Sequence, residues 1–436
     1  MNLVLKKAIR LIVCGVPGRQ CSYSTRSRGY EVVIGGGGIM GCSSALFLAQ
    51  RVQPSSICIV ERDPKYQQAS TPLSVGSIRQ QFSIPANIQL SMYSSEFIRN
   101  IATHLQVDDN DPPDVQFIPG SYVFLATAEG EDGLRDNFKV QKDQGAAVEL
   151  MNPHQLKEKY PWINTEGIVL ACRGVRNEGW FDPWLLLSAF KKKVLSMGVH
   201  YVTGELSAVA VEDKRVSSVE VTTENGNKEH IGCDHFVNAG GPWASQLALM
   251  AGIGDPTHSN KVMRAPLPVK PRRRCVFVIK CPDLITEEFP MLINIDGTYL
   301  RKEGVQNTFI CGVRTPEHLD HDDLELEVDY SLFDEYAWPS IAHRVPAFES
   351  LKLQSAWAGY YDYNTLDQNA IIGRHPVINN LVFANGFSGH GIQQSPAVGR
   401  AVSEIVLDGC SHSIDLSRFS FERVVNGQPY KEKNIV

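Results

Sequence analysis

EVVIGGGGIMGCSSALFLAQ, residues 31–50, joins an apolar run to a stretch of small and apolar residues through four consecutive glycines. The run Glu31-Val-Val-Ile34 is typical of a buried parallel strand, and residues 42–50 are typical of a helix. Between them Gly36, Gly38 and Gly41 fit the pattern G-x-G-x-x-G. In this pattern the first glycine permits a tight turn, the second lets a pyrophosphate approach the backbone, and the third lets helix and strand pack closely. The stretch therefore predicts a dinucleotide-binding turn, with a purely structural glycine-rich turn as the alternative.

A second apolar run, Ile57-Cys-Ile-Val60, ends in Glu61, twenty residues after Gly41. A carboxylate at this distance is expected to meet the hydroxyl pair of a ribose. The same carboxylate disfavours a 2′-phosphate, so NAD or FAD is expected rather than NADP. The expected contacts of these two turns with the cofactor also include Ile39, Met40 and Arg62.

A second glycine-rich loop lies near the C-terminus, in LVFANGFSGHGIQQSPAVGR at residues 381–400. The pattern predicts a strand over Leu381–Ala384 and a helix from about Ser395, with Pro396 at its first position. Backbone N–H groups of such a loop and helix start can face the pyrimidine edge of a reduced flavin. A second loop of this kind favours FAD over NAD, although an ordinary strand-loop-helix connection is the alternative. The expected contacts are Gly389, His390, Gly391, Ile392 and Gln393.

These two loops and the segment FVNAGGPW at residues 236–243 together resemble the FAD-dependent D-amino acid oxidase and sarcosine oxidase superfamily. Gly240 and Trp243 of that segment are expected to contact the cofactor. Two longer stretches, at residues 70–91 and 354–376, are similar to one branch of the superfamily. That branch consists of mitochondrial FAD-dependent oxidoreductase-domain proteins that serve as assembly factors for respiratory complex I. The resemblance runs from about residue 29 to the C-terminus.

The resemblance implies an α/β fold with a Rossmann-like FAD-binding domain and a mainly antiparallel β-sheet substrate domain. The sequence patterns at residues 117–127, 275–280 and 308–314 are typical of strands of such a sheet. The FAD domain is expected to be discontinuous and the two domains to meet at the cofactor. Its expected segments are 29–105, 186–255 and 355–436, and those of the substrate domain are 106–185 and 256–354.

The resemblance also implies site residues. Arg79 lies where the sarcosine oxidase branch has an arginine that binds the substrate carboxylate, a task that suits a planar guanidinium. The alternative is an arginine that pairs with the cofactor or with a surface acid. Tyr360 and Tyr361 are expected to pack on the flavin and bind substrate, with core packing as the alternative. We therefore take Arg79, Tyr360 and Tyr361 as the candidate catalytic residues.

Two positions depart from the sarcosine oxidase pattern. Gln393 stands where that branch has a second, lysine anchor for the carboxylate. Tyr360 stands near the position of the cysteine that attaches flavin covalently, so noncovalent FAD is expected. Lys280 is the nearest candidate for the lysine that promotes reaction with oxygen.

The triplet Arg272-Arg-Arg274 is interpreted as a solvated face, with a docking surface as a further use.

The amino-terminal residues differ in charge from the rest of the chain. Residues 1–30 hold six basic side chains and no acidic one, whereas the remainder holds 36 basic and 48 acidic side chains. Residues 1–28 are expected to be a mitochondrial presequence, and a secretory signal or a disordered tail are the alternatives. The acidic body disfavours nucleic acid as a partner, and no other stretch is apolar enough to span a membrane.

The ten cysteines show no metal-binding spacing and are expected to be reduced.

Two functions remain open at this point. One is a protein of the mitochondrial matrix, or of the matrix face of the inner membrane, that is required for assembly of complex I and contacts its subunits or assembly intermediates. The other is a flavoenzyme that oxidises the C–N bond of an amino acid or N-methyl amino acid, a small carboxylate-bearing amine. The change at Gln393 favours the first, because it removes an expected substrate anchor.

Overall fold

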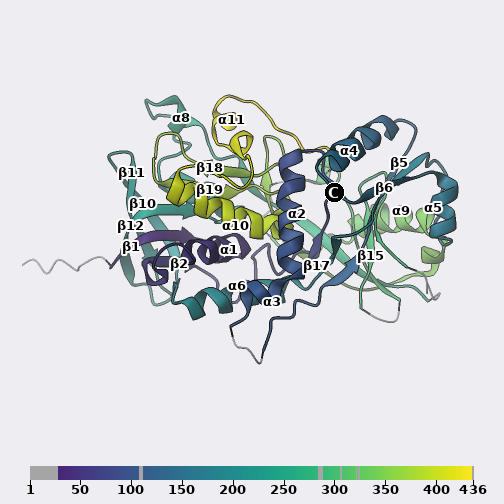
Figure 1. Cartoon of the computed structure of the whole chain (residues 1–436), viewed down its shortest axis with the longest axis horizontal. Coiled ribbons are helices and arrows are strands. Elements are labelled where there is room, and N and C mark those ends of the chain that lie inside the picture. Colours follow the sequence, from purple (N-terminus) through teal and green to yellow (C-terminus); the bar gives the residue numbers. More distant parts are fainter. Residues whose placement is uncertain are drawn as a thin grey trace, which may run out of the picture.

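The computed structural model describes residues 28–107, 111–282, 288–304, 307–320, 322 and 325–434. The expected presequence lies outside these residues, except for Arg28, where the first strand begins. The chain forms two large sheets, one on each side of helix α2 (Pro85–Arg99), as Figure 1 shows. Within the described ranges, no helix is both long and apolar enough to cross a lipid bilayer.

The first sheet contains the predicted dinucleotide-binding strands. Strand β1 (Arg28–Gly35) lies at its centre and pairs in parallel with β2 (Ile57–Glu61) and with β12 (Lys228–Asn238). Its side chains at Val32, Val33 and Ile34 are completely buried, as a parallel strand covered on both faces requires. The other strands of this sheet are β9 (His200–Thr203), β10 (Glu205–Glu212), β11 (Arg215–Thr222), β18 (Ile371–Arg374) and β19 (Leu381–Asn385).

Helices α1 (Ile39–Ala49) and α10 (Gly391–Asp408) pack against each other on this sheet. Their contact is close because Gly399 faces Ser43, where a Cβ on the glycine would approach the serine Oγ to 2.1 Å. Each of the two helices follows one of the predicted glycine loops. The remaining helices of this half are α3 (Ile101–Leu105), α6 (Pro183–Met197), α7 (Ala244–Met250), α8 (Lys261–Arg264) and α11 (Glu422–Val425), with short turns η1 (Pro54–Ser56), η2 (Gly241–Trp243) and η6 (Ser417–Phe419).

The start of α10 corrects a sequence prediction. The helix begins at Gly391 rather than near Ser395, and Pro396 lies inside it instead of at its first position. Proline lacks the N–H that would bond to the carbonyl of Ile392. The hydroxyl of Ser395 donates to this carbonyl instead (2.9 Å), which allows the helix to continue through the proline. The helix start is therefore close enough to the glycine loop to form part of the site.

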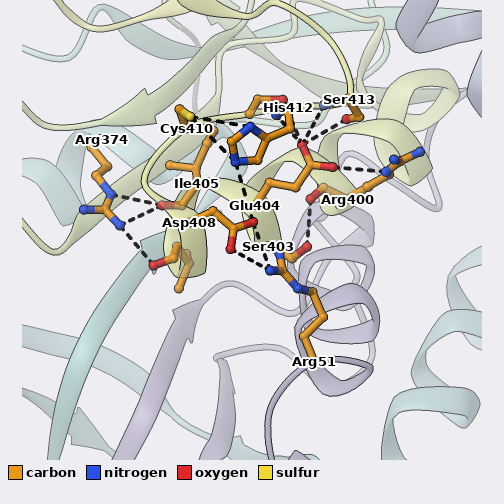
Figure 2. A network of polar contacts seen from close by, with 12 residues as sticks. Arg51, Arg374, Arg400, Ser403, Glu404, Ile405, Asp408, Cys410, His412 and Ser413 are labelled. Atoms are coloured by element: carbon orange, nitrogen blue, oxygen red, sulfur yellow. Dashed lines mark hydrogen bonds and ion pairs between the residues drawn. The ribbon is translucent and has the colours of Figure 1, made fainter.

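Polar contacts hold the far end of α10, as Figure 2 shows. Glu404 accepts hydrogen bonds from the backbone N–H groups of His412 (2.7 Å) and Ser413 (3.0 Å). Arg374 donates to the carbonyl of Ile405 at 2.7 Å, so it caps one of the last carbonyls of the helix. Arg51, just after α1, pairs with Asp408 at the end of α10 (2.7 Å). The two helices that begin at the glycine loops are thus also joined at their other ends.

The second sheet is mainly antiparallel, with one parallel pair between β14 and β5. Its order is β17 (Lys352–Asn364), β13 (Val269–Lys280), β16 (Thr308–Gly312), β15 (Tyr299–Lys302), β14 (Met291–Ile293), β5 (Tyr122–Ala126), β7 (Leu170–Gly174) and β6 (Val148–Met151). Helices α4 (Glu131–Asp143), α5 (Pro153–Lys159) and α9 (Trp338–Arg344) and turns η3 (Glu317–Leu319), η4 (Leu332–Ala337) and η5 (Pro346–Ser350) accompany it.

A small third sheet contains β3 (Ser77–Ile78), β8 (Glu178–Trp180) and β4 (Ile118–Gly120). The strand expected over residues 117–127 is therefore two strands, β4 and β5, in different sheets. The division into an FAD domain and a substrate domain stays a prediction. Its expected boundary between residues 354 and 355 falls within β17, which pairs along its length with β13 of the second sheet.

Candidate functional site

The first glycine loop connects β1 to α1, and its glycines meet different demands. Gly36 has a φ of +108°, and a Cβ there would approach the carbonyl oxygen of Ala239 to 2.4 Å. A Cβ on Gly41 would lie 1.9 Å from the carbonyl oxygen of Gly36. At Gly38, the N-cap of α1, the nearest protein atom to such a Cβ is the Oγ1 of Thr71 at 3.5 Å. Gly36 and Gly41 are thus required by the fold, whereas Gly38 leaves space next to the helix N-terminus.

Glu61 ends β2 beside this loop. Its carboxylate accepts the backbone N–H of Gly37 (2.7 Å) and that of Asp63 (2.9 Å), which fixes its orientation. Burial raises the pKa of Glu61, and the two N–H groups act in the opposite direction. Next to it the guanidinium of Arg62 stacks on the ring of Trp243, 3.8 Å from the ring centre. This end of the site therefore presents an oriented acceptor and a flat cationic and aromatic surface.

The second glycine loop connects β19 to α10. Gly389 has a φ of +98°, and a Cβ there would approach the ring of Tyr361 to 2.5 Å. His390 is the N-cap of α10, so the first N–H groups of the helix, from Gly391 onward, have no partner within the helix. A helix N-terminus of this kind stabilises negative charge on a ligand.

One cavity connects the two loops. It is lined by all of the predicted site residues except Gly41, namely Gly36, Gly38, Ile39, Met40, Glu61, Arg62, Arg79, Gly240, Trp243, Tyr360, Tyr361, Gly389, His390, Gly391, Ile392 and Gln393. Gly41 instead packs against the backbone of the first loop, as described above. The structure thus brings together residues from three distant parts of the chain, while their individual roles stay predictions.

Arg79 is the most deeply buried charged group of this cavity, with only 1% of its surface exposed. Its guanidinium donates to the carbonyl oxygens of Gln81 and Asn434, and it contacts the Nε2 of His390 at 3.1 Å. In the part of the chain that the structure describes, it forms no ion pair with a carboxylate. Burial lowers the pKa of Arg79. A buried cation next to a cavity whose hydrogen-bond partners here are two carbonyls and a neutral imidazole favours an anionic ligand.

His390 is neutral in this setting. Burial and, second, the positive charge of Arg79 hold its pKa well below the usual range. Because arginine can only donate, the Nε2 that faces Arg79 carries the lone pair. The edge of the Phe82 ring also packs against it, with ring centres 5.2 Å apart. His390 therefore orients Arg79 and adds no second positive charge to the cavity.

The tyrosines of β17 surround the same space. Tyr360 packs edge-on against Trp243, with ring centres 5.8 Å apart, and Tyr361 lies against Gly389. Neighbouring residues of a strand usually face opposite sides, yet Tyr360, Tyr361 and Asp362 all line the cavity. This part of β17 therefore contributes consecutive residues to the cavity wall.

Two basic residues of β13 are placed differently from the sequence interpretation. Arg274, expected on a solvated face, lines the cavity and donates to both carboxylate oxygens of Asp320 (2.7 and 3.2 Å). Its guanidinium lies 5.1 Å from the centre of the Tyr361 ring. Lys280 is exposed at the other end of the strand and does not line the cavity. The run of three arginines predicts a solvent-exposed face because charge alone does not show on which face of the strand each side chain lies.

Sequence reasoning missed most of the wall opposite the glycine loops. This wall is made of side chains from the second sheet and from the segment before β3, among them Val75, Tyr122, Val276, Met291, Ile293 and Tyr299. These residues carry no shared motif and come from separate strands. Only the strand pairing of the second sheet brings them to one place.

The donors and the space of the cavity fit FAD. Gly38 offers the open approach that a pyrophosphate needs, Glu61 an acceptor for ribose hydroxyls, and the start of α10 the N–H groups for the flavin ring. The isoalloxazine would then lie toward Arg79, Tyr361 and the second sheet. Tyr360 has no thiol, so this position cannot form the covalent bond to flavin that a cysteine would form.

Comparisons with known proteins agree with this assignment. The family model DAO, described as FAD dependent oxidoreductase, matches residues 31–405. The "FAD-dependent oxidoreductase domain-containing protein 1" of Xenopus laevis is 48% identical over 423 residues, which cover 93% of this chain and 85% of that protein. The protein of the same name from Bos taurus is 45% identical and covered to 87%, again over 93% of this chain.

The fold also matches solved structures. L-Proline dehydrogenase from P. horikoshii aligns with a TM-score of 0.78 and 24% identity, covering 93% of this chain and 100% of that one. This likeness confirms the expected fold class, a Rossmann-like FAD-binding part with a mainly antiparallel sheet. The family match, to FAD dependent oxidoreductases, confirms FAD as the cofactor.

Proposed function

The chain belongs to the DAO family of FAD-dependent oxidoreductases, and on this basis we propose that it oxidises the C–N bond of a small carboxylate-bearing amine. The observation that carries the proposal is Arg79, a buried guanidinium that faces the cofactor cavity without a carboxylate partner among the described residues. A substrate carboxylate that accepts from the guanidinium N–H groups not used by Gln81, Asn434 and His390 would form an ion pair that the described residues do not supply.

The side chains around Arg79 would orient the substrate. Bound FAD would accept the electrons released from the substrate C–H bond. Neutral His390 holds the guanidinium from one side, and the ring of Tyr361 packs against Gly389 of the second glycine loop. The apolar wall of Val276, Met291 and Ile293 would exclude water from the reacting atoms.

A ligand titration tests the anchor. Benzoate, a simple carboxylate, is added to the FAD-loaded protein and binding is followed by the change in flavin absorbance. We expect Arg79→Ala to retain FAD and to weaken benzoate binding at least about 30-fold, the cost of losing a buried charged partner. Arg273→Ala is the matched control, because it removes an arginine that does not line the cavity. Equal benzoate affinity of wild type and Arg79→Ala would contradict the proposal.

The reaction itself needs a second test. A panel of amino acids and N-methyl amino acids is added under anaerobic conditions, and bleaching of the flavin band identifies a substrate. Acid precipitation of a separate sample should release yellow colour into the supernatant, since Tyr360 leaves the FAD noncovalently bound. A flavin that no carboxylate-bearing amine bleaches would contradict the enzymatic proposal.

We further propose that the protein acts in the mitochondrial matrix, or at the matrix face of the inner membrane, in the assembly of respiratory complex I. Gln393 supports a role besides catalysis. Its side-chain oxygen accepts the backbone N–H of Arg79 (3.0 Å), so this position serves the geometry of the loop and provides no second cation. The similarity at residues 70–91 and 354–376 described above points to the same role.

This role is tested in cells that lack the protein. The amount of complex I is measured by native electrophoresis and compared after return of wild type, of Arg79→Ala or of a variant that cannot bind FAD. Rescue by Arg79→Ala would separate assembly from substrate oxidation. A normal amount of complex I in the cells without the protein would contradict the assembly role.

A further inference from the structure

The last described residues of the chain, Tyr430–Asn434, end at Arg79 and are here called the C-terminal strap. Figure 1 shows this part of the chain running from α11 toward α2 and α4. Its start is held where the N–H of Tyr430 donates to Asp367 (2.8 Å) and its carbonyl accepts from Asn369 (3.0 Å). The strap is thus bound from its first residue onward.

Glu432 fastens the middle of the strap to α2. Its carboxylate is completely buried and accepts the N–H of Ser83 (2.6 Å), the hydroxyl of Ser83 (2.5 Å), the N–H of Ile84 (3.2 Å) and the amide of Asn87 (3.0 Å). Ile84 is the N-cap of α2 and offers no side-chain cap of its own. A carboxylate at this end of a helix satisfies free N–H groups and interacts favourably with the helix dipole. Glu432 is therefore the cap of α2, although it lies nearly 350 residues away in the sequence.

Asn434 links the strap to Arg79, the proposed substrate anchor. Its N–H donates to Glu432 (2.9 Å), and its side chain accepts from Asn137 of α4 (2.8 Å) and donates to the carbonyl of Gln81 (3.3 Å). Its own carbonyl oxygen accepts a hydrogen bond from the guanidinium of Arg79. Arg79 also donates to the carbonyl of Gln81, so the strap holds both carbonyls that fix the guanidinium.

We propose that the C-terminal strap is a positioning element for Arg79: Glu432 locks the strap on α2, and Asn434 sets the direction in which the guanidinium meets a carboxylate ligand. The inference rests on the proposed role of Arg79. A guanidinium that loses its fixed acceptors keeps its charge and loses its orientation, and the binding of a carboxylate by its remaining N–H groups depends on that orientation.

A double-mutant cycle tests the strap with the FAD-loaded full chain and benzoate as the probe. Asn434→Ala keeps the backbone carbonyl that accepts from Arg79 and removes the side-chain bonds to Asn137 and Gln81 that hold this carbonyl in place. We expect Glu432→Gln and Asn434→Ala each to keep FAD and to weaken benzoate binding about 10-fold or more. In the Arg79→Ala background the same two changes should have no further effect, because they act through the arginine. Lys433→Ala is the matched control, since its side chain is exposed between the two positions.

The possible outcomes are distinct. Wild-type affinity in Asn434→Ala, or equal losses with and without Arg79, would overturn the inference, because the strap would then act on stability alone. If the wild-type protein binds no benzoate, the proposed role of Arg79 as a carboxylate anchor is contradicted. Crystal structures of the wild type and of Asn434→Ala then test the strap separately. A displaced Arg79 guanidinium in Asn434→Ala supports positioning, and an unchanged one overturns it.

Discussion

The two ends of the cavity are built in different ways. The cofactor end consists of two glycine loops, each a short continuous stretch of sequence whose backbone faces the ligand. The opposite end consists of side chains from β5, β13, β14, β15 and β17, which lie far apart in the chain. A site made from backbone is sensitive to any added Cβ, whereas a wall made from side chains depends on packing and on charge. The changes below test this contrast.

The largest effect is expected at Gly41. An alanine Cβ would lie 1.9 Å from the carbonyl oxygen of Gly36, so the loop or α1 must move. We expect Gly41→Ala to lower the free energy of unfolding by about 3 kcal/mol or more and to abolish FAD binding. Urea unfolding of the FAD-free protein and the flavin content after purification measure the two effects. Gly133→Ala, in an open position of α4, is the control and should be neutral or slightly stabilising.

Gly38 should separate cofactor binding from stability. A side chain here has space in the protein but would occupy the place of the pyrophosphate. We expect Gly38→Leu to weaken FAD binding about 100-fold or more and to change the stability of the FAD-free protein by less than about 0.5 kcal/mol. Flavin titration and urea unfolding check the pair of values. A normal flavin content would refute the assignment of this loop.

The free energy of unfolding should depend on pH through Glu178, which lies next to Tyr122 of the opposite wall. This carboxyl group is buried beneath Tyr122, and burial raises its pKa to about 7, against the effect of the N–H groups of Gln80 and Tyr122. Because the folded protein then binds the proton more tightly than the unfolded chain, the contribution of Glu178 to stability is fully present below about pH 4 and is lost as the pH rises through about 7. The loss attributable to this group is on the order of 3 kcal/mol.

Glu178→Gln should remove this contribution. We expect the difference in unfolding free energy between pH 5 and pH 8 to be smaller in the variant than in the wild type, as measured by urea unfolding at both values. Parallel pH profiles of the two proteins would show that the carboxyl group titrates normally.

The smallest effect is expected at the ends of α1 and α10. Arg51 and Asp408 form a close ion pair, but both side chains are about one third exposed. Exposed pairs contribute little, so Arg51→Ala should cost about 0.5 kcal/mol and leave FAD binding unchanged. Thermal unfolding and flavin content check this, and a loss of FAD would show that the far ends of the helices control the glycine loops.

The parts of the site that sequence reasoning found are those with local signals. Glu61 was recognisable because it ends an apolar run at a set distance from Gly41, and β2 places it beside the first loop. The start of α10 was predicted too late because Pro396 is normally a helix start signal. The hydroxyl of Ser395 overrides that signal, and this contact is visible only in three dimensions.

The cofactor end can be recognised in the amino-acid sequence, because glycine spacing, a following helix and a carboxylate at the end of the next strand are constraints between near neighbours. The surroundings of Arg79 depend instead on tertiary packing. Its acceptors come from Gln81 and Asn434, its neighbour His390 from the second loop, and the opposite wall from separate strands. Such contacts depend on how sheets and helices pack, and no periodicity or spacing along the chain encodes them directly.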